Sequence, residues 1–306
     1  MVITVKHLVK KYEDLIAIND ISFEVKRKEV FAFLGPNGAG KTTTVEILEC
    51  LRDPTSGVAE VLGYDVSDKR GQEEIKNRIG VLPQDFSTFD LLNSRENLQY
   101  YARMYGNEAC DIDALISLVG LDEKSNALYK TLSGGLKRRL AIAITLVNDP
   151  EVVFLDEPTS ALDPKARREI WTVLEGLRKQ GKTIFLTTHY MEEAEALANN
   201  VCILDRGKIV AEGSPADLIT KYGGNTNLIL KGDPKDILKD LPTTGLEKLE
   251  DKIKVSILEE DSVRKILGKV SRSGMELDKL EITKPSLEDV FLKLTGKRIT
   301  DEGTVT

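Results

Sequence analysis

Three runs of consecutive apolar residues stand out along the chain, and each has the length of one buried strand. They are Val30-Phe31-Ala32-Phe33-Leu34, the apolar stretch within residues 151–157, and Thr183-Ile184-Phe185-Leu186-Thr187. The segment 79–84 predicts a further short strand. Strands that are apolar on both sides are typical of parallel sheets covered by helices. The pattern therefore predicts an α/β fold that binds its ligands at the carboxyl ends of the strands.

Alternating apolar and polar positions at the start of the chain predict strands with one polar face. They occupy Val2-Ile3-Thr4-Val5 and the series Ile21, Phe23, Val25. Helical patterns follow at 41–52, through most of 88–150 and at 164–181, and a hairpin is expected at 201–211. Asn93 and Glu96 have the spacing of a capping box, and Asp163 precedes a proline at a first helical position.

A break at Tyr222-Gly223-Gly224-Asn225 predicts a domain boundary, with one domain at 1–222 and a smaller one at 225–306. The second domain is predicted to run strand 227–230, helix 234–241, strand 246–249, strand 252–258, helix 262–270 and strand 276–282. This β-α-β-β-α-β order is the ferredoxin-like arrangement of an α+β domain. A last helix is expected from Pro285-Ser286 to Leu294, followed from Arg298 by a polar, frayed tail.

Composition narrows the classes of protein. The net charge of −7 over 306 residues argues against a general nucleic-acid binder, which would be basic. No apolar run approaches the roughly 18 residues that span a bilayer, and no signal peptide is visible at the start. Cys50, Cys110 and Cys202 lack metal-ligand or C-x-x-C spacing, which predicts reduced, structural thiols in a cytosolic protein.

The strongest motif follows the first buried strand and precedes a helix. It is Gly35-Pro36-Asn37-Gly38-Ala39-Gly40-Lys41-Thr42-Thr43, which fits the phosphate-binding loop G-x-x-x-x-G-K-[ST]. Its glycines let backbone N–H groups turn toward one anion, and the helix adds the positive end of its dipole. Lys41 is expected to reach the β- and γ-phosphates, and the Thr42 hydroxyl to ligate Mg²⁺.

Other chemistry-bearing residues lie at the ends of the later strands. Asp156 is suited to bind Mg²⁺, and Glu157 beside it could accept a proton from an attacking water. His189 follows the third apolar strand, and Gln84 ends the strand at 79–84. Tyr12 is expected in a loop. Its ring either packs, half-buried, against the protein or provides a flat face on which a purine stacks, and its position in the sequence does not decide between these alternatives.

With these residues in order, the chain resembles the nucleotide-binding subunit of an ATP-binding cassette (ABC) transporter. Leu132-Ser133-Gly134-Gly135-Leu136 is similar to the family's signature loop and Ser160-Ala161-Leu162-Asp163 to its dimer-contact loop. Gln84 and His189 match its glutamine and histidine switches, and Tyr12 its adenine-stacking aromatic. One residue departs from the pattern, because the family usually has glutamine where this chain has Leu136.

The resemblance implies a P-loop NTPase fold of the ABC type, with a parallel core sheet, an antiparallel β subdomain and a helical subdomain at about 88–150. It implies that Thr42, Gln84 and Asp156 hold Mg²⁺, and that Glu157 is the base, with Lys41, Gln84 and His189 at the γ-phosphate. Ser133, Gly134, Gly135 and Asp163 would contact the ATP of a partner cassette, so two chains would face each other head to tail around two ATP molecules.

It also implies a separately encoded membrane permease as partner and a place on the inner face of the plasma membrane, with no transmembrane segment of the chain's own. Residues 284–296 are similar to the C-terminal extension of the drug-exporter branch, the daunorubicin-resistance type, although any amphipathic helix would share their pattern. The transported molecule and the identity of the partner cassette stay open.

Three alternatives remain. A soluble ABC ATPase acting on nucleic acid or ribosomes would show a long coiled-coil insertion, two cassettes or basic patches, and none is visible. A catalytically silent cassette is disfavoured by Lys41, Asp156 and Glu157. Import rather than export is disfavoured only by the C-terminal extension.

Overall fold

The computed structural model describes residues 1–231, 243–249, 252–257, 264–265, 268, 279–300 and 302–305. The chain divides into two compact units. The first comprises Met1–Pro215 together with Ile299–Thr306, and the second comprises Ala216–Arg298. Within the described residues, no helix has both the length and the hydropathy needed to cross a bilayer.

A six-stranded sheet forms the centre of the first unit, in the order β10-β9-β3-β8-β7-β6. Its strands are β3 (Val30–Leu34), β6 (Ile79–Leu82), β7 (Val152–Asp156), β8 (Thr183–Thr188), β9 (Asn200–Asp205) and β10 (Lys208–Gly213). All neighbours are parallel except β9 and β10, which form the expected hairpin. The three apolar runs are buried along their whole length, as predicted.

Helices α1 (Lys41–Leu48), α6 (Pro164–Lys179) and α7 (Met191–Leu197) follow strands of this sheet. Asp163 caps α6 and Pro164 opens it, as predicted. Helix α1 is shorter than the predicted 41–52. Cys50 has a φ of +58°, which no helical residue adopts, so the chain turns away just after the cap at Glu49.

A second, antiparallel sheet has the order β2-β1-β4-β5. Its strands are β1 (Ile3–Tyr12), β2 (Leu15–Val25), β4 (Ser56–Val61) and β5 (Tyr64–Asp65). Tyr12 pairs with Leu15, so the predicted loop around Tyr12 is wrong: Tyr12 ends a strand and only Glu13 and Asp14 form the turn. The φ of Glu13 is +47°, the conformation that such a tight hairpin requires.

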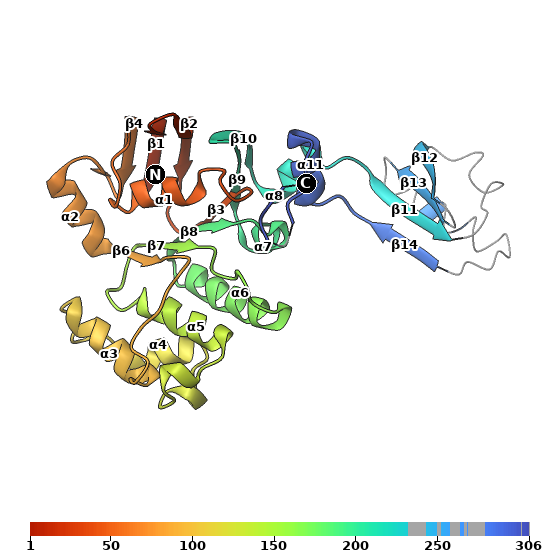
Figure 1. Cartoon of the computed structure of the whole chain (residues 1–306). Helices are drawn as coiled ribbons and strands as arrows, with labels where there is room; N and C mark the ends of the chain where they lie inside the picture. The colour runs from red at the N-terminus through yellow and green to blue at the C-terminus, as the bar shows by residue number, and fades with distance from the viewer. Residues whose placement is uncertain are drawn as a thin grey trace. The chain divides into compact units, whose positions relative to one another are not determined.

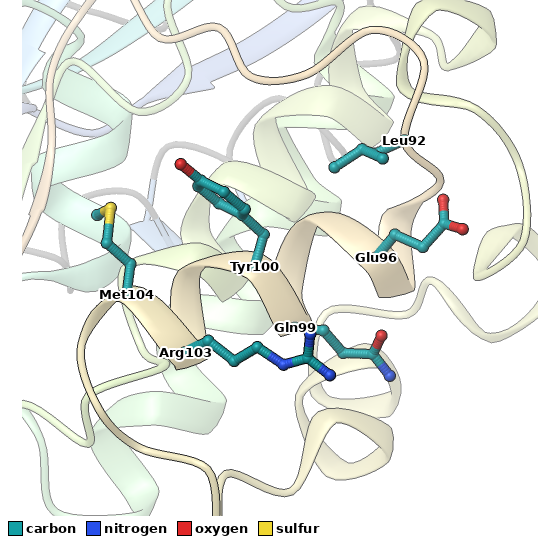
Figure 2. Close-up of a pocket in the computed structure, with 6 residues that line it drawn as sticks. All are labelled: Leu92, Glu96, Gln99, Tyr100, Arg103 and Met104. Carbon is teal, nitrogen blue, oxygen red and sulfur yellow. The ribbon is translucent and has the colours of Figure 1, made fainter.

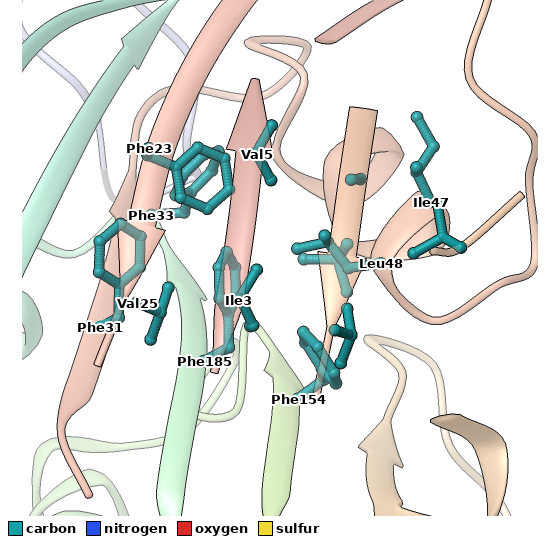
Figure 3. Packing of buried hydrophobic residues seen from close by; sticks show 14 of the residues in the cluster. Ile3, Val5, Phe23, Val25, Phe31, Phe33, Ile47, Leu48, Phe154 and Phe185 are labelled. Atoms are coloured by element: carbon teal, nitrogen blue, oxygen red, sulfur yellow. The ribbon is translucent and has the colours of Figure 1, made fainter. Parts of the chain in front are cut away.

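The core lies between the two sheets and is dominated by aromatic rings (Figure 3). Phe23 of β2 lies 5.4 Å from Phe31 of β3, centroid to centroid, and Phe185 of β8 lies 5.3 Å from Phe33 and 5.5 Å from Phe154. Each buried ring contributes about 1.5–3 kcal/mol through the area it removes from water. This core fixes β3, β7 and β8, whose carboxyl ends carry the candidate chemistry.

Helix α2 (Lys69–Arg78) leads into β6, and a mostly helical segment follows it. The segment contains α3 (Ser94–Met104), α4 (Ile112–Leu118), 3₁₀ turns at Asp122–Lys124 and Tyr129–Thr131, and α5 (Gly134–Ile144). The predicted capping box is present, since Asn93 and Glu96 each accept a hydrogen bond from the other's backbone N–H. In Figure 1, α3 to α5 lie on one side of the six-stranded sheet and β1, β2 and β4 on the other.

The second unit contains α8 (Pro215–Tyr222), β11 (Thr226–Lys231), β12 (Thr243–Leu249), β13 (Lys252–Ile257), β14 (Lys279–Thr283) and α11 (Leu287–Thr295). The four strands form an antiparallel sheet in the order β12-β13-β11-β14. The predicted strands and last helix are thus present. The predicted helix 234–241 lies outside the described residues, as does most of the predicted helix 262–270.

The end of the chain contradicts the predicted frayed tail. Residues 299–300 and 302–305 belong to the first unit, where Thr300 and Thr304 close a small turn. The backbone N–H of Asn37, in the predicted phosphate loop, donates to Gly303 O at 2.7 Å, and its side-chain amide donates to Glu302 O at 2.9 Å. This contact could not be predicted from local pattern, because the tail has no apolar periodicity.

Candidate nucleotide site

The glycine-rich segment 35–43 joins β3 to α1. Gly38 and Gly40 have φ values of +78° and +104°, in the region that L side chains avoid. A Cβ on Gly40 would lie 2.6 Å from the carbonyl oxygen of Ala17, so only glycine fits. Positive φ at these two residues turns successive backbone N–H groups toward one side, beside the N-terminus of α1. The segment therefore has the backbone shape of a phosphate cradle.

Lys41 opens α1 and its side chain folds back over this cradle. Its Nζ donates to Gly35 O at 2.8 Å and Pro36 O at 3.2 Å, and lies 3.4 Å from Glu157 Oε1. Burial lowers the pKa of Lys41, while the charge of Glu157 opposes that shift. The ammonium thus lies beside the amides that would face a phosphate.

Asp156, at the end of β7, accepts two hydroxyl donors. Thr42 Oγ1 donates to its Oδ2 at 3.0 Å, and Thr187 donates to the other oxygen. Burial raises the pKa of Asp156, while these two hydrogen bonds oppose the shift. A carboxylate and a hydroxyl 3.0 Å apart form a hard oxygen donor set that suits Mg²⁺, which usually takes one or two protein carboxylates and completes its shell with water and phosphate. The residues present fit that ion.

Glu157 lies between two potential cations. Its Oε2 is 3.1 Å from His189 Nδ1, and its Oε1 faces Lys41. Burial opposes ionisation of Glu157, but the close contact with His189 and the charge of Lys41 outweigh it and hold the pKa of the carboxyl below its usual value. Its φ of +46° is rare for a residue with a side chain. The carboxylate is therefore ionised at neutral pH and able to accept a proton.

A cleft of about 550 Å³ collects many of the predicted residues. Its lining includes Tyr12, Asn37, Gly38, Gly40, Lys41, Thr42, Thr43, Gln84 and Glu157. Gly35, Pro36 and Ala39 belong to the loop but do not line the cleft. A Cβ on Gly35 would lie 2.5 Å from Leu204 O, so that glycine serves close packing of the loop on β9.

Four further residues that were not predicted from the sequence line the same cleft: Leu15, Ile16, Ala17 and Arg206. Leu15 and Ile16 are 65% and 44% exposed, although both are large and apolar, and they follow Tyr12 in the β1–β2 hairpin. The signal available in the sequence is the apolar pair Leu15-Ile16, which directly follows Tyr12 and two acidic residues. Arg206 lies in the turn of the hairpin predicted at 201–211, where nothing distinguished it from a solvated charge.

The signature segment lies elsewhere in the chain. Ser133 is the N-cap of α5, and its hydroxyl accepts from Leu136 N at 3.4 Å. A Cβ on Gly135 would lie 3.0 Å from Cβ of Ala166, in the first turn of α6, whose N-cap is Asp163. The lining of the cleft includes none of Ser133, Gly134, Gly135 and Asp163. If these residues contact a nucleotide, it is not through this chain's own cleft.

Comparison with known families and relatives agrees with this geometry. Residues 18–160 match the ABC transporter family, and residues 213–295 match the C-terminal domain of DrrA1-3-like ATP-binding proteins. The Nod factor export ATP-binding protein I of Cupriavidus pinatubonensis is 38% identical over 312 residues, which cover 98% of this chain and 92% of that protein. Its counterpart from Burkholderia pseudomallei is also 38% identical, over 95% of this chain and 96% of that protein.

Solved structures show the same architecture. CbiO1 from Clostridium perfringens, part of the ABC transporter complex cbiONQ, aligns with a TM-score of 0.64 and 27% identity over 72% of this chain and 91% of its own. The dimeric bacterial ABC transporter cassette MJ0796 aligns with a TM-score of 0.61 and 27% identity over 69% of this chain and 98% of its own. The chain therefore belongs to the ABC transporter family and is one of its ATP-binding, ATP-hydrolysing subunits.

Proposed function

We propose that this chain hydrolyses Mg²⁺-ATP at the interface of two cassettes and that the cycle drives export through a separately encoded membrane permease. The observation that carries the hydrolytic part is the position of Glu157, whose carboxylate lies between Lys41 Nζ and His189 Nδ1 inside the nucleotide cleft. A catalytically silent cassette would not require an ionised carboxylate at this position in the cleft.

The side chains have distinct roles in this proposal. Lys41 and the amides of the loop bind the β- and γ-phosphates. Tyr12, Leu15 and Ile16 form an apolar surface on which the purine ring packs. Thr42, Asp156 and Gln84 would hold Mg²⁺, which neutralises phosphate charge when it is bound. Glu157 accepts the proton of the water that attacks the γ-phosphorus, and His189 orients Glu157 through Nδ1. Hydrolysis then leaves ADP and phosphate.

The two-cassette arrangement is supported by the separation of the signature loop from this chain's own cleft. The N-terminus of α5 at Ser133 and the glycines after it make an anion site that the chain's own cleft does not use. A head-to-tail pair with twofold symmetry would bring that site to the partner's γ-phosphate. The dimeric state of the cassette MJ0796 supports the same arrangement here.

Export is supported by the DrrA1-3-like C-terminal match and by the relatives named Nod factor export ATP-binding protein I. A cytoplasmic chain held at the inner face of the plasma membrane by its permease is the corresponding location. Import and a soluble role on ribosomes or nucleic acid find no support in these relatives.

A candidate surface for the permease lies along α3. A groove there is lined by Leu92, Glu96, Gln99, Tyr100, Arg103 and Met104 (Figure 2). Leu91 and Met104 are 72% and 61% exposed, and Phe89 packs edge-on against Tyr100 with a centroid distance of 4.6 Å. Exposed apolar side chains mixed with charged ones are typical of a protein-binding surface.

The permease proposal can be tested by co-purification of this chain with the polytopic membrane protein that we expect a neighbouring reading frame to encode. We expect Met104→Lys to abolish co-purification and to leave the ATPase rate of the isolated chain within about twofold, less than 0.5 kcal/mol. Val58→Lys is the matched control, because Val58 is 44% exposed on β4, away from α3. Unchanged co-purification of the Met104 variant would reject α3 as the docking surface.

A further inference from the structure

Arg138 on α5 makes an unusual set of contacts for a residue outside the cleft. Its Nε donates to Pro158 O at 2.8 Å, and its Nη2 to Asp156 O at 2.8 Å and Glu157 O at 2.9 Å. Its Nη1 donates to Pro83 O and Gln84 O, each at 3.1 Å. All five acceptors are backbone carbonyls, and they belong to only two segments, the one that follows β6 and the one at the end of β7, residues 156–158.

The contacts match the chemistry of a guanidinium. Arginine has five N–H donors in a fixed plane, and here the five bonds occupy all three nitrogens. Lysine has three donors on one atom, so it cannot reach both segments with the same geometry. A neutral amide has two donors. Replacing Arg138 would remove five hydrogen bonds, of which the three to Asp156, Glu157 and Pro158 are partly buried, and this loss costs free energy and loosens the segments.

The two segments carry the side chains that the proposed reaction uses. Gln84 lines the cleft, and Glu157 is the proposed base. The φ of Glu157 is +46°, a conformation that persists only where surrounding contacts hold it. The bonds of Arg138 to the carbonyls of Asp156, Glu157 and Pro158 span that strained residue on both sides.

Helix α5 itself begins at the signature loop. Ser133 caps it, and Arg138 lies five residues further along the same helix. The signature loop, the Gln84 segment and the Glu157 segment are therefore connected through one helix and one of its side chains.

We propose that Arg138 is a positioning residue that sets the Glu157 and Gln84 segments against the signature helix. The inference rests on the proposed role of Glu157 as the base. Arg138 touches no nucleotide atom in this proposal and acts through the backbone of the two segments.

The neighbouring Arg139 provides a matched control. It is on the same helix and its Nη1 also donates to backbone carbonyls, those of Val119 and Gly120, at 3.2 and 3.1 Å. Its Nη2 lies 3.6 Å from Glu169 of α6. None of these partners belongs to the cleft, so loss of Arg139 disturbs packing around α5 without disturbing Glu157.

The test compares Arg138→Gln, Arg138→Lys and Arg139→Gln in the full chain, by steady-state ATP hydrolysis and thermal unfolding. A small misplacement of a reacting group costs up to about 100-fold in rate. We expect Arg138→Gln to lower kcat roughly 10- to 100-fold with KM nearly unchanged, and Arg138→Lys to recover part of the loss. Arg139→Gln should keep kcat within about threefold. Equal losses in the two glutamine variants would overturn the proposal.

A double-mutant cycle with Glu157→Gln separates positioning from general destabilisation. If Arg138 acts through Glu157, its substitution adds little to the loss that Glu157→Gln already causes. If the loss in kcat of the double variant equals the product of the losses of the two single variants, the proposal is overturned. Arg138→Lys takes the place of Arg138→Gln in the same cycle if the glutamine variant does not fold. Failure of the proposed function would give a different result, because Glu157→Gln alone would then hydrolyse ATP at the parental rate.

Discussion

At the scale of single residues, the site depends on charges that burial makes expensive. Lys41, Asp156, Glu157 and His189 are each at most 6% exposed. Each is paired: Lys41 and His189 with Glu157, and Asp156 with two threonine hydroxyls. Buried charges persist in proteins only when such partners are present. The cluster therefore costs stability on its own, as expected of residues that serve the proposed chemistry rather than folding.

Lys41→Ala tests the phosphate loop. It removes a charge-assisted phosphate contact of about 1.5–3 kcal/mol, so ATP affinity should fall roughly ten- to a hundredfold and turnover further. Equilibrium binding of a fluorescent ATP analogue and steady-state hydrolysis measure the two effects. Lys182→Ala is the control, because Lys182 pairs with Asp149 outside the cleft. Hydrolysis by Lys41→Ala at the parental rate would refute the assignment.

Glu49 gives a prediction about pH and stability. It is 6% exposed after α1, and burial, together with the charges of Asp156 and Glu46, raises its pKa to about 8. Below its unfolded pKa near 4.5 both states are protonated. Between that pH and about 8 only the unfolded state ionises, so this group's contribution to stability falls as pH rises.

Glu49→Gln removes this ionisation. We expect the variant to be more stable than the parent at pH 8.5, by one to a few kcal/mol, or roughly 2–4 °C in unfolding temperature per kcal/mol. At pH 5 the two proteins should differ much less. Thermal unfolding by circular dichroism at both pH values measures the difference in unfolding temperature between the variant and the parent. A difference that is larger at pH 5 than at pH 8.5 would contradict the pKa shift.

At the scale of elements, the local signals predicted most of the first unit. β3 matches its apolar run residue for residue, and α6 begins at the predicted cap because Asp163 and Pro164 act within a few residues. The end of α1 was missed because the left-handed Cys50 carries no sequence mark. Arg138 was missed for a related reason: its five acceptors are distant in sequence, and an arginine on a helix resembles any solvated charge.

The departure at Leu136 can be judged from the helix that follows it. The cap of α5 uses the backbone N–H of Leu136 and the Ser133 hydroxyl, so it does not depend on the side chain at position 136. We expect Leu136→Gln to hydrolyse ATP within about threefold of the parent, less than 0.7 kcal/mol in barrier. A change beyond tenfold in a steady-state assay would show that this side chain has a part in catalysis.

At the scale of the whole molecule, the candidate chemistry is confined to the first unit, and the return of the tail to Asn37 was beyond prediction from local pattern. The predicted boundary at 222–225 defines a truncation. A chain ending at Gly223 keeps every residue that lines the cleft and loses the tail contact. Its ATP affinity should stay within about threefold, or 0.7 kcal/mol.

Calorimetric titration with ATP measures this affinity, and a chain ending at Arg298 separates the effect of the tail from that of the second unit. A truncated protein that folds, by its circular dichroism, but binds no nucleotide would show that residues beyond 223 complete the site.

The central claim, hydrolysis between two cassettes, predicts a trapped dimer. Glu157→Gln keeps the shape of the side chain but cannot accept a proton, so hydrolysis should fall roughly 10²–10⁴-fold while binding through Lys41 and Thr42 survives. Loss of the carboxylate charge also reduces repulsion near the γ-phosphate, which favours the closed pair. Ser133→Arg would block the opposing site without touching the chain's own loop, and Ser67→Arg, on an exposed turn, is its control.

The most direct measurement is light scattering of these variants during size-exclusion chromatography in Mg²⁺-ATP. The account predicts a dimer for Glu157→Gln, the same dimer with Ser67→Arg added, and a monomer with Ser133→Arg added. A combined Glu157→Gln and Ser133→Arg chain that dimerises as well as Glu157→Gln alone would contradict the head-to-tail site.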